Sequence, residues 1–584
     1  MIVALSSFIL WIPAVLGWGS LAVLIRQKLH EPDPRRFELF DPLCGFSVLA
    51  VLGTLLNFFT PLTWQISLFL LAGGCLLFWL RLKKPVKLKI SPSVGLAVAW
   101  LGLIAVQMLR STANPDTGLY QFQTVKWMNS YPVAFGLANL HGRLGFNSAW
   151  LAAAAVLQSP FGPQRSAGLF IPTGVIVALF GFFVYQVGSE FFNKKLISAA
   201  SIFMLLSSLF IWSPYLLPNM NTLSTDIPTS FLVLSCAYYG LSYIEGRCGK
   251  AYSIFVCFYI AFFSVTVKFS ALPLFTLPAL LLLAAFIYSR KKSKKQPGLL
   301  PRENRPFPEW RSLVQLTAIS GAVLVMPWLA RNILLSGCLV YPVTFTCIPG
   351  LPWAVPQANV ASEAAWIQSW ARQPGAAPQV VLANSQWLKT WIEWRFIYLL
   401  PAILSITLGS FLLLILKKPA VVDDPPGFLW IAGPFFICLA FWFCTAPDLR
   451  FGEGYLWSIS LIYISLVIRR IMMQSNISVR SKSRWQVSVN ILVVSIFMLA
   501  CYLLISTSYT DLSSQLPPLK DHLLTLSLLK PAQVEAHTTR NGVMVYVPVQ
   551  SDECLDAPLP CTPGLQENLT VIKNQARYTF YLSP

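Results

Sequence analysis

The segment LFIPTGVIVALFGFFVYQV, residues 169–187, decides the fold class of this chain. Its polar members are Thr, Tyr and Gln, and no residue in it carries a charge. An α-helix needs about 20 such apolar residues to cross the hydrocarbon core of a bilayer. We therefore predict that this segment is a transmembrane helix.

Segments of the same kind recur along the 584 residues. Windows of about 20 apolar residues give about fourteen candidate spans. They lie at residues 2–25, 43–59, 64–80, 94–109, 169–187, 196–212, 227–244, 251–267, 271–288, 313–329, 396–416, 428–443, 455–467 and 487–505. Charged residues make up 11% of the chain, against about 25% in a typical soluble domain. The composition predicts an all-α polytopic membrane protein and excludes a soluble enzyme, a disordered chain and a secreted disulfide scaffold.

The net charge of +20 follows the loops between these spans. When the chain is threaded with its amino terminus outside, most of the 43 lysines and arginines fall in the loops on one side. Loops rich in Lys and Arg stay in the cytoplasm. The charge therefore predicts a topology in which the amino terminus and the C-terminal tail are extracytoplasmic. It does not indicate a nucleic-acid partner.

Two outer segments, 111–168 and 331–395, are too long to be turns. In the first, Leu119, Phe122, Val125 and Met128 recur every third residue, which suits a short amphipathic helix in the membrane interface. Residues 149–157 are apolar but too short to cross the bilayer, so we expect them to rest at the interface too. The tryptophans of the second segment predict a lid at the headgroup level, namely Trp366, Trp370, Trp387, Trp391 and Trp394.

The tail after about residue 506 is polar enough to form a small extracytoplasmic domain, either α/β or all-β, with short strands at 543–549 and 578–582. Four of the 12 cysteines form close pairs on the outer side, Cys338 with Cys347 and Cys554 with Cys561. An oxidising compartment permits disulfides, and a domain this small needs a staple. We predict two disulfide bonds; the alternative is four free thiols.

Ionisable residues are nearly absent from the span interiors and gather at their outer ends. This placement favours a membrane-embedded enzyme that opens outward over an alternating-access carrier. Asp116 follows the fourth span, and it is either a general base near the bilayer surface or a helix cap. Asp226 opens the seventh span, and it is either a second carboxylate that binds a metal or orients an acceptor, or again a cap.

Lys268 and Arg450 are the cations placed to act with these carboxylates. Lys268 joins two spans without a loop, and it either holds a lipid phosphate or snorkels to the headgroups. The guanidinium of Arg450 either binds a phosphate in bidentate fashion or pairs with Asp448 or Glu453. The other candidate substrate-binding residues are Lys126, His141, Arg143, Arg331, Arg395 and Tyr455. A structural role is the alternative for His141.

Several of these residues stand in short motifs. They are Asp116 in the long outer loop, Thr-Asp-Ile-Pro at 225–228, Lys-Phe-Ser-Ala-Leu-Pro at 268–273, and Arg331-Asn332 followed by Tyr341-Pro342. In this order they resemble the GT-C superfamily of integral-membrane glycosyltransferases, particularly the bacterial relatives of protein mannosyltransferases and of lipid A aminoarabinose transferase. In this sequence Cys338 replaces an Asn of the family's pattern, and the family's usual second carboxylate directly beside the first is missing.

The resemblance covers about residues 94–470 and suggests four regions. Residues 1–93 hold three amino-terminal spans, 94–470 a GT-C-like catalytic core, 471–506 an inner loop and the last span, and 507–584 the extracytoplasmic domain. The resemblance implies transfer of a sugar, with inversion, from a polyprenyl-phosphate donor to a hydroxyl of a glycan, lipid or protein acceptor. The reaction would take place at the outer face of the bacterial cytoplasmic membrane.

The resemblance also implies roles for the candidate residues. Asp116 would be the general base and Asp226 the second catalytic carboxylate. Lys268 and Arg450, helped by Arg143 or Arg395, would neutralise the departing phosphate. A divalent metal ion, Mg²⁺ or Mn²⁺, is left open.

Two other functions remain as alternatives. An outer-leaflet polysaccharide polymerase or ligase would rely on His141 and Arg143, and Asp116 would be dispensable. A non-enzymatic lipid or solute transporter would need access from both faces and polar residues at the midplane of its spans.

Overall fold

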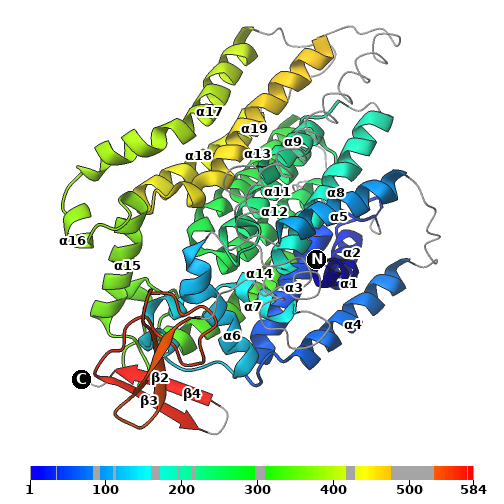
Figure 1. Cartoon of the computed structure of the whole chain (residues 1–584). Helices are drawn as coiled ribbons and strands as arrows, with labels where there is room; N and C mark the ends of the chain where they lie inside the picture. The colour runs from blue at the N-terminus through cyan, green and yellow to red at the C-terminus, as the bar shows by residue number, and fades with distance from the viewer. Residues whose placement is uncertain are drawn as a thin grey trace.

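The computed structural model describes residues 2–33, 36–82, 92–108, 114–158, 171–194, 197–212, 219–295, 309–415, 428–474, 532–574 and 577–582. Figure 1 shows a bundle of long helices with a small β region at one end. The span expected at 487–505 lies outside the described residues.

The first half of the chain is helical. Its elements are α1 (Ile2–Trp18), α2 (Leu21–Lys28), α3 (Phe40–Asn57), α4 (Trp64–Leu82), α5 (Pro92–Gln107), the π-helical turn η1 (Thr117–Gln121), α6 (Phe122–Ser130), η2 (Leu137–Asn139), η3 (Gly142–Gly145), α7 (Ala149–Val156), α8 (Ile171–Lys194), α9 (Ala199–Ser207), η4 (Ser208–Trp212), α11 (Asp226–Glu245), α12 (Lys250–Val267), η5 (Phe269–Phe275) and α13 (Thr276–Lys295).

The second half adds further helices and two hairpins. Its elements are α14 (Trp310–Ser336), η7 (Thr344–Thr346), α15 (Gln357–Arg372), α16 (Pro378–Val381), α17 (Trp387–Ile415), α18 (Phe428–Thr445), α19 (Leu449–Gln474), β1 (Val534–Thr538), β2 (Met544–Pro548), β3 (Leu569–Asn574) and β4 (Arg577–Leu582).

Ten helices in the described part of the chain are long and apolar enough to cross a membrane. The segments Val94–Gln107, Ala199–Ile211 and Trp430–Thr445 form shorter apolar helices at three further predicted spans. The chain is therefore a multi-pass helical protein suited to a membrane, as its hydropathy predicts.

Glycines end two of the long helices. α11 stops at Gly246, whose φ is 63°, and α14 stops at Gly337, whose φ is 79°. Only a residue without a Cβ adopts this left-handed conformation without strain, which makes it a common helix terminator. At Gly337 the chain leaves α14 and continues through the rest of the predicted outer segment 331–395. We call residues 337–395 the lid, after the role that the sequence predicts for this segment.

The amino-terminal helices share one hydrophobic core with the rest of the bundle. Phe46 of α3 and Trp150 of α7 are fully buried, and their ring centroids lie 5.5 Å apart. A Cβ at Gly53 would lie 2.8 Å from a side-chain carbon of Val156, so this glycine lets α7 approach α3 closely. α7 is thus enclosed by protein rather than resting at an interface, which corrects the expectation for 149–157.

The predicted amphipathic helix is present as η1 and α6, but its polar side is covered. Phe122, Val125 and Met128 belong to the bundle core, while Gln123 Nε2 donates to the carbonyl oxygens of Leu555 (2.8 Å) and Ala557. α6 therefore lies between the bundle and the C-terminal β region, as Figure 1 shows.

The C-terminal region consists of two antiparallel hairpins, β1–β2 and β3–β4. Phe135 pairs with the edge of β4, because its N–H donates to Tyr578 O (3.0 Å) and its carbonyl accepts from Phe580 N (2.8 Å). Trp127 of α6 contacts the rings of Tyr578 and Phe580 edge-on. Both predicted disulfides, Cys338–Cys347 and Cys554–Cys561, are present.

Buried ion pairs tie the helices together at the other end of the bundle. Asp41 of α3 accepts from Arg26 Nη2 of α2 (2.8 Å) and from Arg81 Nη1 of α4 (2.9 Å). The side chains of Arg26 and Asp41 are completely buried. These bonds fix α2, α3 and α4 against each other.

Candidate active site

Asp116 is the centre of a charged cluster at the loop end of the bundle, where α12 and α14 end and α11 and α19 begin. Its Oδ1 accepts from Arg143 Nη1 at 3.2 Å, and its Oδ2 accepts from Arg450 Nη1 at 2.8 Å. The Asp116 side chain is 15% exposed, and it makes no capping hydrogen bond to η1. Its carboxylate therefore binds two guanidinium groups and does not cap η1, the helix that follows.

Lys268 and Asp226 form a second ion pair, which adjoins the first. Lys268 follows the last residue of α12 and pairs with Asp226 at the start of α11. Lys268 Nζ lies 3.4 Å from the centroid of the Phe451 ring, and Arg450 Cζ lies 4.8 Å from the same centroid. The ring of Phe451 thus joins the two ion pairs through cation–π contacts. The Asp226 carboxylate also accepts from Ser224 Oγ (3.1 Å).

The turn that presents Arg450 is held by the lid. Trp391 Nε1 and Arg395 Nη1 both donate to the carbonyl oxygen of Pro447, at 2.7 and 3.0 Å. Asp448 accepts from the backbone N–H of Arg450 at 3.2 Å, and its carboxylate lies 3.8 Å from Arg450 Nε. Arg450 therefore contacts Asp448, which is one of the two alternatives considered from the sequence, and it also pairs with Asp116, which was not predicted. Its binding of a phosphate stays a prediction.

Sequence reasoning missed one carboxylate of this cluster. Glu363 of α15 places its Oε1 3.7 Å from Arg143 Nε, and its side chain is 17% exposed. Burial raises the pKa of Glu363 above its ordinary value of 4.5, an effect that Arg143 partly offsets. Glu363 is the only acidic residue in α15, which is the one local signal that could have identified it.

Two predicted binding residues lie away from the cluster. Lys126 Nζ points to the C-terminal region and donates to Asp556 Oδ1 (2.7 Å) and Ala557 O (2.8 Å). Arg331 is 2% exposed and donates to Asn57 Oδ1 at 2.7 Å. Both side chains hold parts of the protein together in this structure.

The remaining candidates have mixed placements. Arg395 reaches the cluster only through Asp448, 3.9 Å away, and through the turn that it supports. Tyr455 is buried in the bundle core. His141 precedes η3, and burial lowers its pKa from 6.5 to about 4, so it is neutral near pH 7.

The carboxylates of the cluster do not match the donor set of a divalent metal site. Both oxygens of Asp116 accept from guanidinium groups, and Asp226 is engaged by Lys268 and Ser224. Within the described ranges, no group of three or more His, Cys, Asp or Glu side chains is placed to hold a metal ion. Mg²⁺ and Mn²⁺ prefer several oxygen ligands, so we assign no step to a metal.

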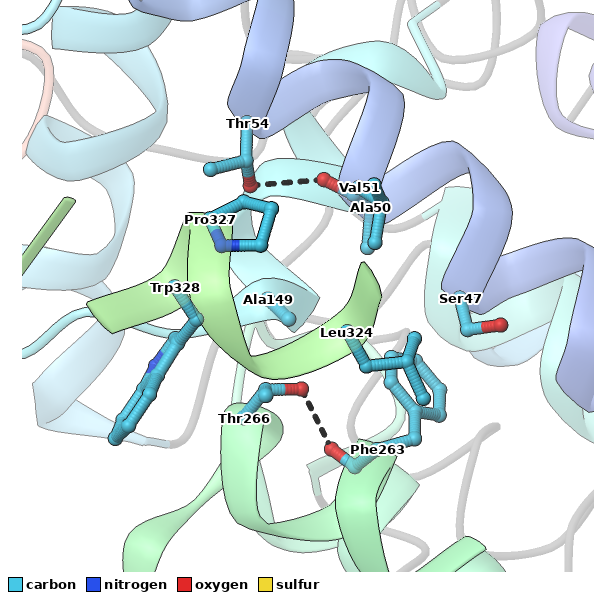
Figure 2. A pocket seen from close by; sticks show the side chains of 10 residues that line it. All are labelled: Ser47, Ala50, Val51, Thr54, Ala149, Phe263, Thr266, Leu324, Pro327 and Trp328. Atoms are coloured by element: carbon cyan, nitrogen blue, oxygen red, sulfur yellow. Dashed lines mark hydrogen bonds between the residues drawn. The ribbon is translucent and has the colours of Figure 1, made fainter. Parts of the chain in front are cut away.

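A small cavity between α3, α7, α12 and α14 is separate from this cluster (Figure 2). Its walls include Leu324, Pro327 and Trp328, and it has room for about one water molecule. The hydroxyls of Thr54 and Thr266 donate to carbonyl groups of their own helices, both at 2.8 Å. The cavity is lined by none of the charged cluster residues and is too small for a sugar.

A family model described as "Domain of unknown function (DUF8201)" matches residues 1–300 and 304–457. The match starts at the first helix and includes the whole charged cluster, whereas β1–β4 lie beyond it. No curated protein and no solved structure matches the chain.

Proposed function

The chain belongs to the DUF8201 family, and we propose that it is an integral-membrane glycosyltransferase. It would transfer a sugar from a polyprenyl-phosphate donor to an acceptor hydroxyl at the extracytoplasmic face of a bacterial cytoplasmic membrane. The motifs that resemble the GT-C superfamily suggest this activity.

One observation carries the proposal. Arg450 and Lys268 lie against the same ring, that of Phe451, at the ends of apolar helices. The phosphate of a membrane lipid lies at this level of a bilayer, since the headgroups border the hydrocarbon core. Two cations held against one ring there suit a phosphate ester whose lipid tail lies among the helices.

The reaction needs a base and a site for the leaving group. The acceptor oxygen forms a bond to the anomeric carbon, and the bond from that carbon to the phosphate oxygen breaks. The electron pair stays on the lipid phosphate, where Lys268 and Arg450 stabilise the charge that develops. A carboxylate takes the proton of the acceptor hydroxyl, and Asp116 is the residue that the sequence predicts for this step.

The polymerase or ligase alternative gives His141 and Arg143 central roles and makes Asp116 dispensable. His141 is half-buried and neutral near pH 7, and it makes no ion pair in the cluster in the described part of the chain. Arg143 lies in the cluster, as this alternative expects, but it pairs there with Asp116, the residue that the alternative makes dispensable, and this pairing supports the glycosyltransferase.

The most informative experiment compares cell-surface glycans and lipid-linked sugars, by mass spectrometry, with and without the gene. We expect the deletion strain to accumulate a polyprenyl-linked sugar and to carry a glycan that lacks it. Complementation with Asp116→Asn should fail to restore the glycan, and complementation with Lys389→Met, on the exposed surface of the lid, should succeed. Identical lipid and glycan profiles in both strains would argue against the proposed function.

A further inference from the structure

Glu363 differs from the other carboxylates of the cluster in its contacts. No described residue donates a hydrogen bond to it, and its Oε1 is shielded from solvent without a hydrogen-bond partner. The nearest cation atom, Arg143 Nε, lies 3.7 Å from Oε1, which is too long for a hydrogen bond. A buried carboxylate oxygen without a donor is costly, so this oxygen is suited to accept one from a ligand.

The surroundings of Glu363 keep it in place without binding its oxygens. A Cβ at Gly142 would lie 2.6 Å from Oε2 and 3.3 Å from the hydroxyl of Tyr341, so the absence of a side chain at Gly142 leaves room for the carboxylate. The side chain as a whole is 17% exposed, so the carboxylate is partly open to solvent although its Oε1 is shielded.

Asp116 is less suited to take a proton. Both of its oxygens already accept hydrogen bonds from guanidinium groups, at 3.2 and 2.8 Å. Protonation of either oxygen would disrupt one of these charged contacts, which are stronger than neutral hydrogen bonds. The contacts of Asp116 instead fix the positions of Arg143 and Arg450.

The contacts of the cluster form a continuous series from Lys268 to Glu363. Lys268 and Arg450 contact Phe451, Arg450 and Arg143 bind Asp116, and Arg143 faces Glu363. Lys268 lies directly after the apolar helix α12, whereas Glu363 is in α15 of the lid. An in-line displacement needs the acceptor and the leaving phosphate on opposite sides of the sugar, so the acceptor is assigned to the Glu363 end of this chain of contacts and the phosphate to the Lys268 end.

We infer that Glu363 of the lid, rather than Asp116, is the general base that takes the proton of the acceptor hydroxyl. This inference rests on the proposed function. The proton passes from the acceptor oxygen to the Glu363 carboxylate, the acceptor oxygen bonds to the anomeric carbon, and the lipid phosphate leaves with the electron pair. The acceptor class is an alcohol, such as a sugar hydroxyl, that reaches the cluster from the lid side.

The electrostatics of Glu363 agree with this role. Burial raises its pKa, and Arg143 of η3 lowers it by a smaller amount. Other titratable groups on the packed elements include His141 before η3, which is neutral near pH 7, and Tyr341, whose pKa is also raised by burial. On the helices themselves they are Arg372 of α15 and Lys389, Glu393, Arg395 and Tyr398 of α17. A base needs its proton removed before reaction, so the rate falls as the pH drops through the pKa of Glu363.

The test uses the full-length chain in membranes of the deletion strain, which supply both natural substrates. Sugar transfer from the lipid-linked pool is measured by mass spectrometry between about pH 5 and pH 8. The variants are Glu363→Gln, Glu363→Asp, Asp116→Asn and the matched lid control Glu393→Gln, whose side chain is exposed. Binding of undecaprenyl phosphate to each purified variant is measured separately.

We expect Glu363→Gln to slow transfer by about 10²- to 10⁴-fold and to abolish the decline of rate at acid pH. It should bind undecaprenyl phosphate as the wild type does. Glu363→Asp should recover part of the rate together with the acid decline. Asp116→Asn should be slow but keep the acid decline, and Glu393→Gln should match the wild type.

Two outcomes would overturn the inference. In the first, Glu363→Gln transfers sugar at the wild-type rate with the wild-type pH profile, while the proposed function stands. In the second, Asp116→Asn rather than Glu363→Gln loses the acid decline. Wild-type membranes that transfer no sugar and a wild-type chain that does not bind undecaprenyl phosphate would instead overturn the proposed function, and this inference with it.

Discussion

Lys126→Met tests whether this lysine binds substrate, as its position in the sequence predicts, or fastens the C-terminal region. Lys126 Nζ donates to Asp556 Oδ1 at 2.7 Å, to Ala557 O at 2.8 Å and to Asp556 O at 3.1 Å. Its own side chain is 10% exposed, and that of Asp556 is 38% exposed. Substitution by Met keeps the length of the side chain and removes all three bonds.

The size of the effect follows from these contacts. Hydrogen bonds to a charged group contribute about 1.5–3 kcal/mol each, but Ala557 O keeps a second donor in Gln123. The ion pair is discounted to about 1 kcal/mol or less because Asp556 is partly in solvent. We estimate a loss of about 3 kcal/mol in docking free energy, or roughly 100-fold more frequent opening of the β region.

Hydrogen–deuterium exchange measures this opening directly. We expect amides of β2 and of the Cys554–Cys561 loop to exchange roughly 100-fold faster in Lys126→Met, with exchange in α11 and α12 unchanged. Lys389→Met is the control, because Lys389 is exposed on α17. Unchanged exchange in Lys126→Met, together with weaker binding of undecaprenyl phosphate, would refute the structural role and favour substrate binding.

Three further predictions concern stability. Asn57→Leu removes the hydrogen bond from the buried guanidinium of Arg331 and those that Asn57 Nδ2 donates to the carbonyl oxygens of Met128 and Tyr131. It should destabilise the protein by about 3–5 kcal/mol, seen as a lower temperature of thermal inactivation. Asn57→Asp keeps an acceptor for Arg331 but loses the amide donors, so it should lose less, and equal losses would contradict a role of the Arg331 bond. Trp391→Phe should cost about 1 kcal/mol in the same assay, since Arg395 still donates to Pro447 O, and a loss above about 3 kcal/mol would show a different role. Burial lowers the pKa of His141 in the folded protein from 6.5 to about 4, so between these pH values the unfolded chain binds more protons than the folded chain. The free energy of unfolding therefore has its full value above about pH 6.5 and declines toward pH 4, by at most about 3 kcal/mol. His141→Gln should reduce this acid decline, and an unchanged decline would point to another group.

Hydropathy predicted the long helices well, because a lipid-crossing helix needs the same apolar length wherever it lies. It misplaced α7, since a helix buried among other helices is as apolar as one that faces lipid. Gly53, which admits α7 to the bundle, carries no signal of this use in the sequence.

The candidate site was predictable only in part. Asp116, Asp226, Lys268 and Arg450 stand at span ends, where a charge has few other uses, and the structure brings them together. The position of Lys126 in α6 gave no hint of Asp556, which lies 430 residues further along the chain.

These long separations have a consequence for biosynthesis. Asp116 is synthesised early, and Arg450 follows 334 residues later. Asp556, the partner of Lys126 in α6, follows later still. Until α19 is inserted, the nascent chain holds Asp116 without one of its two arginines and lacks the ring on which Lys268 rests. Ribosomes that stall or terminate early would therefore release fragments in which the charged cluster is incomplete, and the cluster would form only at the end of assembly.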